Sequence, residues 1–561
     1  MHTLRVAAAQ FFSSADVAAN ATLCIDYIRQ AARAGARLVV LPENANRVRD
    51  FDSREECYAG AEDLDGHFVT ALRAAAAELG VYVAVGVDLR GETAPDAHIA
   101  SVLIDADGDV LGVHHKHVLW DYEYTLFVPG DEPYQVFDTP IGRLGLLLCA
   151  DGIVPETPRI LALLGAQVLC NSLNSRGPDE LRVHIPLRAM ENRVWHVAAN
   201  TVGGPADQYP WMGGSQIVGP DGTRHAEASE QHPDLIVADI QPSAADDKLE
   251  PAIGDVFGRR RPELYSALAQ PIDQVQVATL YGKAKGRAQP VTVTALQVSH
   301  FPSSEWSVTR ALGQIEYAGR RGVHLGVLPE MFCFARGEVD ADPEAAARRS
   351  QNVLERLAKA TAKASMHTVA SLVEADGGRL FSTAYVIDAT GTIVHRYRKT
   401  HLRLDEAWAS PGDRIDVVRT DVGVLGALIA DEIWVPEIAR VLAIEGAELL
   451  CHPTDWDRDS AATVAATERA EENRVHIVSS TRLDSPSAIG SQVMRADEFF
   501  PGSPIALMRY PTAYWSRPGF EEQVAITLDL REARSKMMGL HLDPLATRAP
   551  HLYQTITERK H

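Results

Sequence analysis

Residues 142 to 156 of the chain are GRLGLLLCADGIVPE. The apolar run from 143 to 148 is typical of a buried strand, and the run ends at Cys149. A helix is predicted to begin near Pro155 and Glu156, because proline is tolerated in a first helical turn and a glutamate there complements the helix dipole. The cysteine is therefore expected on a tight strand-to-helix turn. Such a turn exposes a nucleophile and directs backbone N–H groups toward the atom that it attacks.

The sequence of this stretch, and of most of the first half around it, is repeated in the second half of the chain. The matched positions are Gln10 with Gln297 and Glu43 with Glu330 at an offset of 287, Lys116 with Lys399 at 283, and 142–156 with 423–437 at 281. Offsets that drift only through short loop deletions indicate two homologous domains in tandem. Each half also closes on a similar segment, RRPELYSAL at 260–268 and RAPHLYQTI at 548–556. We predict a first domain at 1–270, a linker at 271–290 and a second domain at 291–561.

Composition restricts the class of protein. The length of 561 residues exceeds one ordinary core, and β-rich runs that alternate with Ala-rich helical runs predict α/β domains. No apolar run reaches the roughly 18 residues of a membrane span, and the N-terminus lacks the pattern of a signal peptide. Six cysteines without metal-type spacing favour a reducing cytoplasm and no structural metal. A net charge of −21 disfavours nucleic acid and anionic membranes as partners, and the one concentrated basic stretch, GKAKGR at 282–287, is interpreted as solvated linker.

Three reactive side chains of the first half stand at the ends of predicted strands. Glu43 ends LVVLPE, Lys116 ends the strand through HHK, and Cys149 ends LLLC. We expect these strand ends to meet at one edge of one sheet. A cysteine nucleophile needs a base and a cation nearby, because a free thiol with a pKa of about 8.5 is mostly protonated at neutral pH. Cys170 also follows an apolar strand, but it is predicted to be an ordinary buried residue.

These residues carry a family resemblance. LPE with Glu43, HHKHVL with Lys116, EYTLFVPG with Glu123 and CADGIVPE with Cys149 together resemble the nitrilase superfamily of carbon–nitrogen hydrolases. The order, the spacing and the flanking residues all fit, and the resemblance extends over both halves. It implies two tandem αββα four-layer sandwich domains.

The resemblance also implies a role for each matched residue. Glu43 would be the general base, Cys149 the nucleophile that forms a thioester, and Lys116 the cation that stabilises the oxyanion with the backbone N–H of Ala150. Glu123 would be a second carboxylate that orients Lys116. No metal or organic cofactor is implied. Four residues that follow the motif strands are candidates for the substrate pocket, each as readily explained by packing or a turn: Trp120, Tyr122, Asn171 and Asn174.

The second half departs from this pattern at the nucleophile. It keeps Glu330, Lys399 and Glu406, but Ala430 stands where the first half has Cys149. Alanine cannot form a thioester. Cys451 matches Cys170 and Cys333 follows Glu330 by three residues, and neither is marked as a substitute. We therefore predict a second domain that keeps the fold and has lost the reaction.

The predicted activity is hydrolysis of a small linear amide or N-carbamoyl compound. Nitrilases proper resemble CWE at the nucleophile, whereas CAD here is closer to the amidase and carbamoylase branches. Three alternatives stay open: a nitrilase, an acyltransferase that passes the same thioester to an amine, and a non-catalytic binding or scaffold protein. The second domain is predicted to be the tethered half of an intramolecular pseudo-dimer that shapes the active pocket. A ligand-binding role for its leftover charged residues is the rival account, and assembly into a further homo-oligomer is left open.

Overall fold

The computed structural model describes residues 3–48, 51–204, 210–251, 253–281, 289–298, 303–496 and 511–559. Within these residues the chain forms two compact units. Unit 1 contains 3–248 together with the C-terminal segment 537–559, and unit 2 contains 249–496 together with 511–536, apart from the gaps above. These limits differ from the predicted domains, because 249–270 groups with unit 2 and the end of the chain groups with unit 1. The basic stretch at 282–287 lies outside the described residues.

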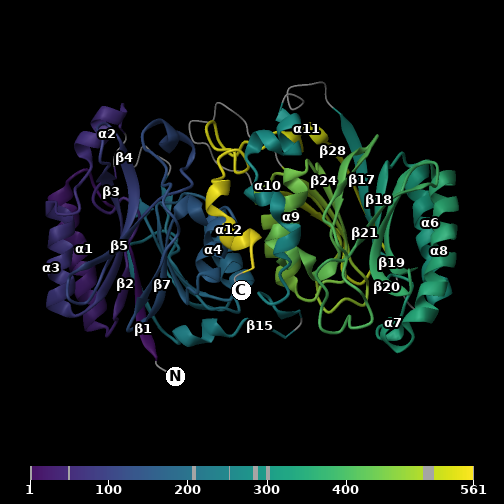
Figure 1. The fold of residues 1–561 in the computed structure, drawn as a ribbon, viewed down its shortest axis with the longest axis horizontal. Coiled ribbons are helices and arrows are strands. Elements are labelled where there is room, and N and C mark those ends of the chain that lie inside the picture. The colour runs from purple at the N-terminus through teal and green to yellow at the C-terminus, as the bar shows by residue number, and fades with distance from the viewer. Residues whose placement is uncertain are drawn as a thin grey trace. The chain divides into compact units, whose positions relative to one another are not determined.

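Unit 1 is built on two six-stranded mixed sheets (Figure 1). The first sheet has the order β14-β1-β2-β3-β4-β5, with β14 (Asp234–Ile240), β1 (Leu4–Gln10), β2 (Leu38–Val40), β3 (Tyr82–Arg90), β4 (Ala97–Ile104) and β5 (Val110–His115). The second has the order β13-β12-β9-β8-β7-β6, with β13 (Arg224–Glu227), β12 (Gln216–Val218), β9 (Trp195–Asn200), β8 (Val168–Leu173), β7 (Gly142–Leu148) and β6 (Val136–Thr139). Strands β1, β2 and β3 are parallel, as are β7, β8 and β9. A short pair, β10 (Val202–Gly203) and β11 (Trp211–Met212), stands apart.

Helices cover the outer faces of these sheets. Those described in unit 1 are α1 (Val17–Arg33), α2 (Arg54–Gly60), α3 (His67–Leu79), α4 (Glu156–Leu163), α5 (Ile185–Asn192) and α12 (Gln554–Thr557). Apolar residues of α1 and α3 form one core with the first sheet, including Ile28, Phe68 and Val83. The sheets contact each other through β3 with β8 and β4 with β7. The result is the predicted αββα order of layers, which Figure 1 shows for this unit.

Unit 2 repeats this architecture. Its first sheet has the order β21-β20-β19-β18-β17-β28, with β21 (Ile393–Arg398), β20 (Arg379–Ile387), β19 (His367–Asp376), β18 (Leu325–Glu330), β17 (Pro290–Leu296) and β28 (Gln523–Asp529). Its second has the order β22-β23-β24-β25-β26-β27, with β22 (Val417–Thr420), β23 (Gly423–Ala427), β24 (Leu449–Pro453), β25 (His476–Ser480), β26 (Gln492–Arg495) and β27 (Thr512–Trp515). A short pair, β15 (Leu249–Glu250) and β16 (Gly254–Asp255), precedes them.

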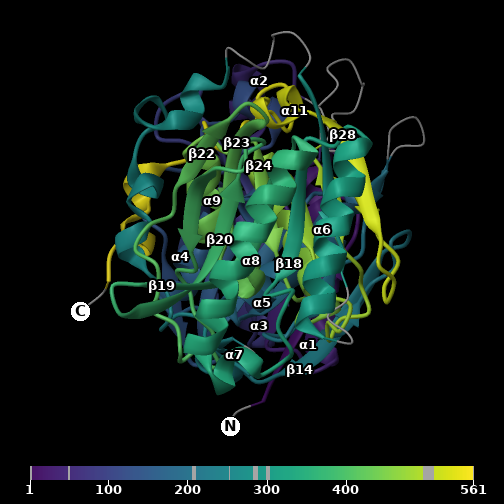
Figure 2. The ribbon, with the colours of Figure 1, turned by 90° about the vertical axis from the view of Figure 1, so that its right-hand side faces the viewer.

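The helices described in unit 2 are α6 (Ser304–Arg320), α7 (Glu338–Ala341), α8 (Pro343–Ala364), α9 (Pro436–Ile444), α10 (Ala466–Asn473) and α11 (Leu530–Arg534). The long helices α6 and α8 lie on the outer face of the first sheet (Figure 2). Strand for strand, the two sheets of unit 2 match those of unit 1, so the tandem repeat seen in the sequence is a repeat of the fold. In the described parts of the chain, no helix combines the length and the apolar character needed to cross a membrane.

Candidate active site

Cys149 lies on a strand-to-helix turn, as residues 142–156 predict. Strand β7 ends at Leu148, a 3₁₀ turn spans Cys149–Gly152, and α4 begins at Glu156. The backbone φ of Cys149 is +40°, a left-handed value that costs a residue other than glycine about 1–3 kcal/mol. The buried Arg188 stabilises this turn, because its guanidinium donates hydrogen bonds to the carbonyls of Gly152 (2.8 Å) and Ile153 (2.7 Å). The fold thus fixes the position of the sulfur. The left-handed backbone at Cys149 directs the side chain differently from an extended strand.

Lys116 connects the two predicted carboxylates. Its Nζ donates to Oε1 of Glu43 and to Oε2 of Glu123, each at 2.8 Å, and its side chain is fully buried. Cys149 and Glu43 interact electrostatically, each acting on the pKa of the other. The four residues assigned to catalysis from the sequence therefore lie together, with Lys116 bonded to both carboxylates.

The strand ends that carry these residues belong to two sheets. Glu43 follows β2 and Lys116 follows β5, both in the first sheet, whereas Cys149 follows β7 in the second. The expectation of one sheet edge was wrong, and the residues meet because the two sheets pack face to face with β4 against β7. Gly86 on β3 permits the close approach of the Glu43 loop, because a Cβ at Gly86 would lie 2.4 Å from the Cα of Glu43.

Burial sets the proton affinities of the site. Desolvation, supported by the negative charge of Glu123, raises the pKa of Glu43 to about 7, although Lys116 opposes the shift. Desolvation and the Glu43 charge also raise the pKa of Cys149 well above its usual value, so the resting sulfur is a thiol. Burial alone would lower the pKa of Lys116, but the charges of Glu123 and Glu43 outweigh it and raise this pKa well above its usual value. At neutral pH the site therefore holds a cation, a protonated nucleophile and a carboxyl group able to exchange a proton.

The four pocket candidates lie in different surroundings. The backbone N–H of Trp120 donates to Oε2 of Glu123 (2.6 Å), and its partly buried side chain packs against the apolar cluster that includes Ala150. Asn174 donates to Oδ1 of Asn44 (3.1 Å), next to Glu43. The buried Asn171 contacts His196 (3.1 Å), and Tyr122 is 54% exposed. Helix α5 carries the buried Asn192, whose amide donates to the carbonyl of Arg188 (3.0 Å), a bond within the helix.

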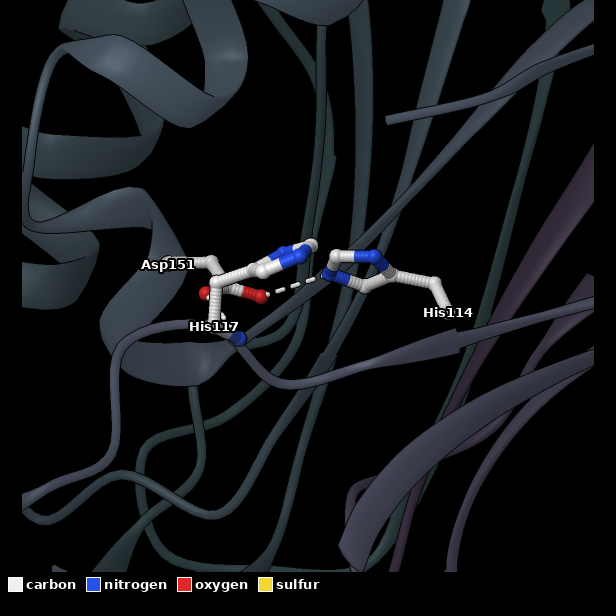
Figure 3. Close-up of side chains that lie close together, drawn as sticks. All are labelled: His114, His117 and Asp151. Carbon is white, nitrogen blue, oxygen red and sulfur yellow. Dashed lines mark hydrogen bonds and ion pairs between the residues drawn. The ribbon is translucent and has the colours of Figure 1, made fainter. Parts of the chain in front are cut away.

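Sequence reasoning missed a buried brace that joins the nucleophile turn to the lysine strand (Figure 3). Oδ1 of Asp151 accepts from the backbone N–H groups of His117 (3.1 Å) and Val118 (2.9 Å), directly after Lys116. Oδ2 of Asp151 pairs with Nε2 of His114 at 2.8 Å. The one signal in the sequence was that a carboxylate stands two positions after both Cys149 and its counterpart in the second half.

His114, His117 and Asp151 are also residue types that bind metal ions, and one candidate ligand atom from each lies within 4.8 Å of the others. Both oxygens of Asp151, however, already accept hydrogen bonds, and Nε2 of His117 bonds to the carbonyl of Glu132 (2.9 Å). The second half forms the same brace with other residue types. There Glu432 accepts from the backbone N–H of Thr400 (2.8 Å) and from the hydroxyl of Tyr397 (2.8 Å). The arrangement thus joins the turn to the strand without metal ligands, which favours the hydrogen-bonded interpretation.

The second-half site keeps the frame and changes the pairing. Ala430 has a φ of +48°, so the strained turn persists without the nucleophile. Lys399 donates to both oxygens of Glu406 (2.9 and 2.7 Å) and pairs with Asp431 (2.5 Å), the residue that replaces Ala150. Glu330 pairs with Arg403 (3.6 Å), which replaces Trp120.

The remaining cysteines considered from the sequence are buried in the described structure. Burial raises the pKa of each thiol to about 12. They are Cys170, Cys333 and Cys451. Cys149 differs from these three because the charges of Glu43 and Lys116 act on its thiol, whereas burial is the main cause of the shift at Cys170, Cys333 and Cys451.

Comparison with known proteins identifies the family. A sequence model of the carbon-nitrogen hydrolase family matches residues 5–247 and again residues 292–485. The chain is 33% identical over 239 residues to a nitrilase of Pyrococcus abyssi, covering 42% of this chain and 89% of that protein. It is 30% identical over 289 residues to the N-carbamoylputrescine amidase of Arabidopsis thaliana (47% and 94%) and 31% identical over 285 residues to the human deaminated glutathione amidase (48% and 85%).

Among solved structures, an amidase of the nitrilase superfamily from Nesterenkonia AN1 is 27% identical, covers 47% of this chain and 96% of that one, and gives a TM-score of 0.40. The family match extends over both halves and includes the motifs of both sites. The chain therefore belongs to the carbon-nitrogen hydrolase family, and it is an amidase-like enzyme of that family that contains the family's domain twice.

Proposed function

We propose that unit 1 hydrolyses the C–N bond of a small linear amide or N-carbamoyl compound through a thioester on Cys149. The observation that carries the proposal is the contact set of Lys116, whose ammonium bridges Glu43 and Glu123, while the Cys149 thiol interacts electrostatically with Glu43 and Lys116. A base, a cation and a nucleophile within hydrogen-bond reach are what acyl transfer to sulfur requires. The amidase names of two relatives support the substrate class.

In the first half-reaction, Sγ of Cys149 attacks the carbonyl carbon as its proton passes to Glu43. The oxyanion that forms is stabilised by the Lys116 ammonium and by the backbone N–H of Ala150. The C–N bond then breaks, and the amine leaves with the proton held by Glu43. A pKa of about 7 for Glu43 suits both transfers at neutral pH, because the group accepts and returns a proton with little loss of driving force.

In the second half-reaction, water attacks the thioester while Glu43 takes one of its protons. Collapse of the tetrahedral intermediate releases the acid and returns the proton to the sulfur. Glu123 orients Lys116 in both halves of the cycle through its 2.8 Å bond to Nζ. The second domain, with Ala430 at the equivalent position, is assigned no chemistry in this scheme.

A nitrile is the second candidate substrate, because a relative at 33% identity is named a nitrilase. The same sulfur would add to a nitrile carbon. The decisive experiment measures ammonia and acid release from matched amides, N-carbamoyl compounds and nitriles, with hydroxylamine added to detect acyl transfer to an amine. Cys149→Ala is the control, and the proposal requires its turnover to be at background. Unchanged turnover in this variant would remove the mechanism.

A further inference from the structure

The segment 537–559 is a part of unit 1, although it follows the second half in sequence. Within it, α12 packs against α4, the helix that begins after the nucleophile turn (Figure 1). His551 extends the contact at the surface, where its Nε2 pairs with Asp131 at 2.6 Å. Tyr553 and Ile556 are buried. The end of the chain is therefore docked in unit 1 through both polar and apolar contacts.

The first turn of this segment contacts the active-site loops directly. Met538 and Leu542, each 1% exposed, form an apolar cluster with Val118, Ala150 and Ile153. Val118 follows Lys116 by two residues, and Ala150 supplies the N–H of the proposed oxyanion site. Met538 and Leu542 therefore pack in the same cluster as a residue of the Lys116 loop and a residue of the Cys149 turn.

A polar contact holds the loop that carries Glu123. The backbone N–H of His541 donates to Oδ1 of Asp121 (2.7 Å), whose backbone φ is +35°. Gly539 lies so close to this carboxylate that a Cβ there would come within 2.6 Å of Oδ1. Segment 537–559 thus contacts both the turn that carries Glu123 and the turn that carries Cys149.

We propose that segment 537–559 is a positioning element of the first-half active site, holding the Lys116–Glu123 loop and the Ala150 turn in their reactive arrangement. The inference rests on the proposed function of Cys149. It predicts that catalysis in the first half depends on the last residues of the chain. A displacement of about 1 Å in such a frame costs on the order of a hundredfold in rate.

Unit 2 also packs a segment that follows the other half against its equivalent turn, and this supports the proposal. Unit 2 includes the segment 249–281, which follows the first half in sequence. There Arg259 donates to the carbonyl of His401 (2.7 Å) and to Asp431 (2.5 Å), and Tyr265 contacts His401 (2.5 Å). A Cβ at Gly254 would lie 3.0 Å from Leu404, the residue that matches Asp121. Each unit is therefore closed over its nucleophile turn by the segment that follows the other half.

The test uses full-length point variants. Gly539→Val places a branched Cβ within 2.6 Å of the Asp121 carboxylate, and Leu542→Ala removes the apolar contact with the cluster that contains Ala150. Leu540→Ala is the matched control, because Leu540 lies in the same turn and is 57% exposed. We expect kcat to fall at least tenfold in the first two variants with KM changed by less than threefold, and to stay within twofold of the parent in the control. Hydrogen exchange over 537–559 reports whether the segment has been displaced.

Two readings overturn the inference. One is parental kcat in a variant whose segment exchanges freely. The other comes from a chain that ends at residue 536: if it is folded, it must lose activity and regain it when a synthetic peptide of 537–561 is added. A folded truncated chain with parental activity, or one that the peptide does not restore, contradicts the proposal.

The rate of Cys149 alkylation by iodoacetamide, followed by intact mass spectrometry, separates this inference from the proposed function. If the parent turns over no amide, the proposed function fails, and the alkylation rate still tests the segment. We expect that rate to fall at least tenfold in Gly539→Val and in Leu542→Ala, because the thiol loses its arrangement with Glu43 and Lys116. Equal rates in parent and displaced variants would overturn the inference on their own.

Discussion

The brace at Asp151 gives the sharpest prediction, through His114→Phe. This change removes the 2.8 Å bond from Nε2 of His114 and leaves Oδ2 of Asp151 with a longer contact to the backbone N–H of Leu148 (3.3 Å). A hydrogen bond to a charged group contributes about 1.5–3 kcal/mol. If that amount is lost from the folded state, the melting temperature of the chain should fall by roughly 3–12 °C. If it is lost from the transition state, kcat should fall roughly ten- to a hundredfold.

The second half supplies the controls. His114→Tyr copies Tyr397, whose hydroxyl donates to Glu432 at 2.8 Å, and should restore most of both losses because a donor again faces Asp151. Tyr397→Phe removes the equivalent bond from unit 2 and should destabilise that unit while leaving turnover unchanged. Calorimetry and steady-state kinetics on the three full-length variants measure these effects. Parental melting temperature and kcat in His114→Phe would show that the brace has no positioning role.

Three further predictions concern the charged residues of the two sites. The value of kcat/KM should rise with pH through about 7, because Glu43 accepts the thiol proton only when it is deprotonated, and Glu43→Gln should lower it at least a hundredfold; a pH–rate profile with an acid limb near 4 would contradict this assignment. Glu123→Gln removes one partner of the buried Lys116, so kcat should fall at least tenfold with a smaller effect on KM, as measured on the best amide of the panel. Ala430→Cys in a Cys149→Ala chain should restore no turnover and no rapid alkylation, because Arg403 pairs with Glu330; activity in this double variant would contradict that view of the second site.

Much of the fold could be predicted because each sequence pattern occurs in both halves of the chain. An apolar run followed by Val-Pro-Glu occurs twice, and each copy forms a strand, a 3₁₀ turn and a helix. The paired glutamines show the limit of such signals. Gln10 and Gln297 recur at a fixed offset, and each accepts a hydrogen bond from a serine N–H, that of Ser215 (2.8 Å) and that of Ser491 (2.7 Å). The two glutamines therefore recur because each makes a hydrogen bond to an element that is far away in the sequence. Periodicity alone could not predict the partner of that bond.

The reactive residues could be named, but their arrangement could not be. Strand-end logic places Glu43, Lys116 and Cys149 together, yet it cannot assign them to one sheet or two, because that depends on how the sheets pack. The closing segments were assigned wrongly for a different reason. RRPELYSAL and RAPHLYQTI were each expected to close the half that they follow, but 260–268 groups with unit 2 and 548–556 groups with unit 1. Because the two segments resemble each other, the sequence does not show which half each one packs on. Only contacts such as that of His541 with Asp121 decide it.

The second half explains why a domain without a nucleophile can be retained. Two substitutions bring charge into its site, Asp431 in place of Ala150 and Arg403 in place of Trp120. Lys399 pairs with Asp431 and Arg403 lies against Glu330, so groups that would serve a substrate bind each other instead. This mutual pairing favours a structural role over the rival account of a ligand site. If segment 537–559 positions Lys116 and Ala150, this structural role can be stated specifically. A chain that lost its second half would also lose the segment that completes its first active site. The degenerate domain is therefore retained together with the segment that follows it.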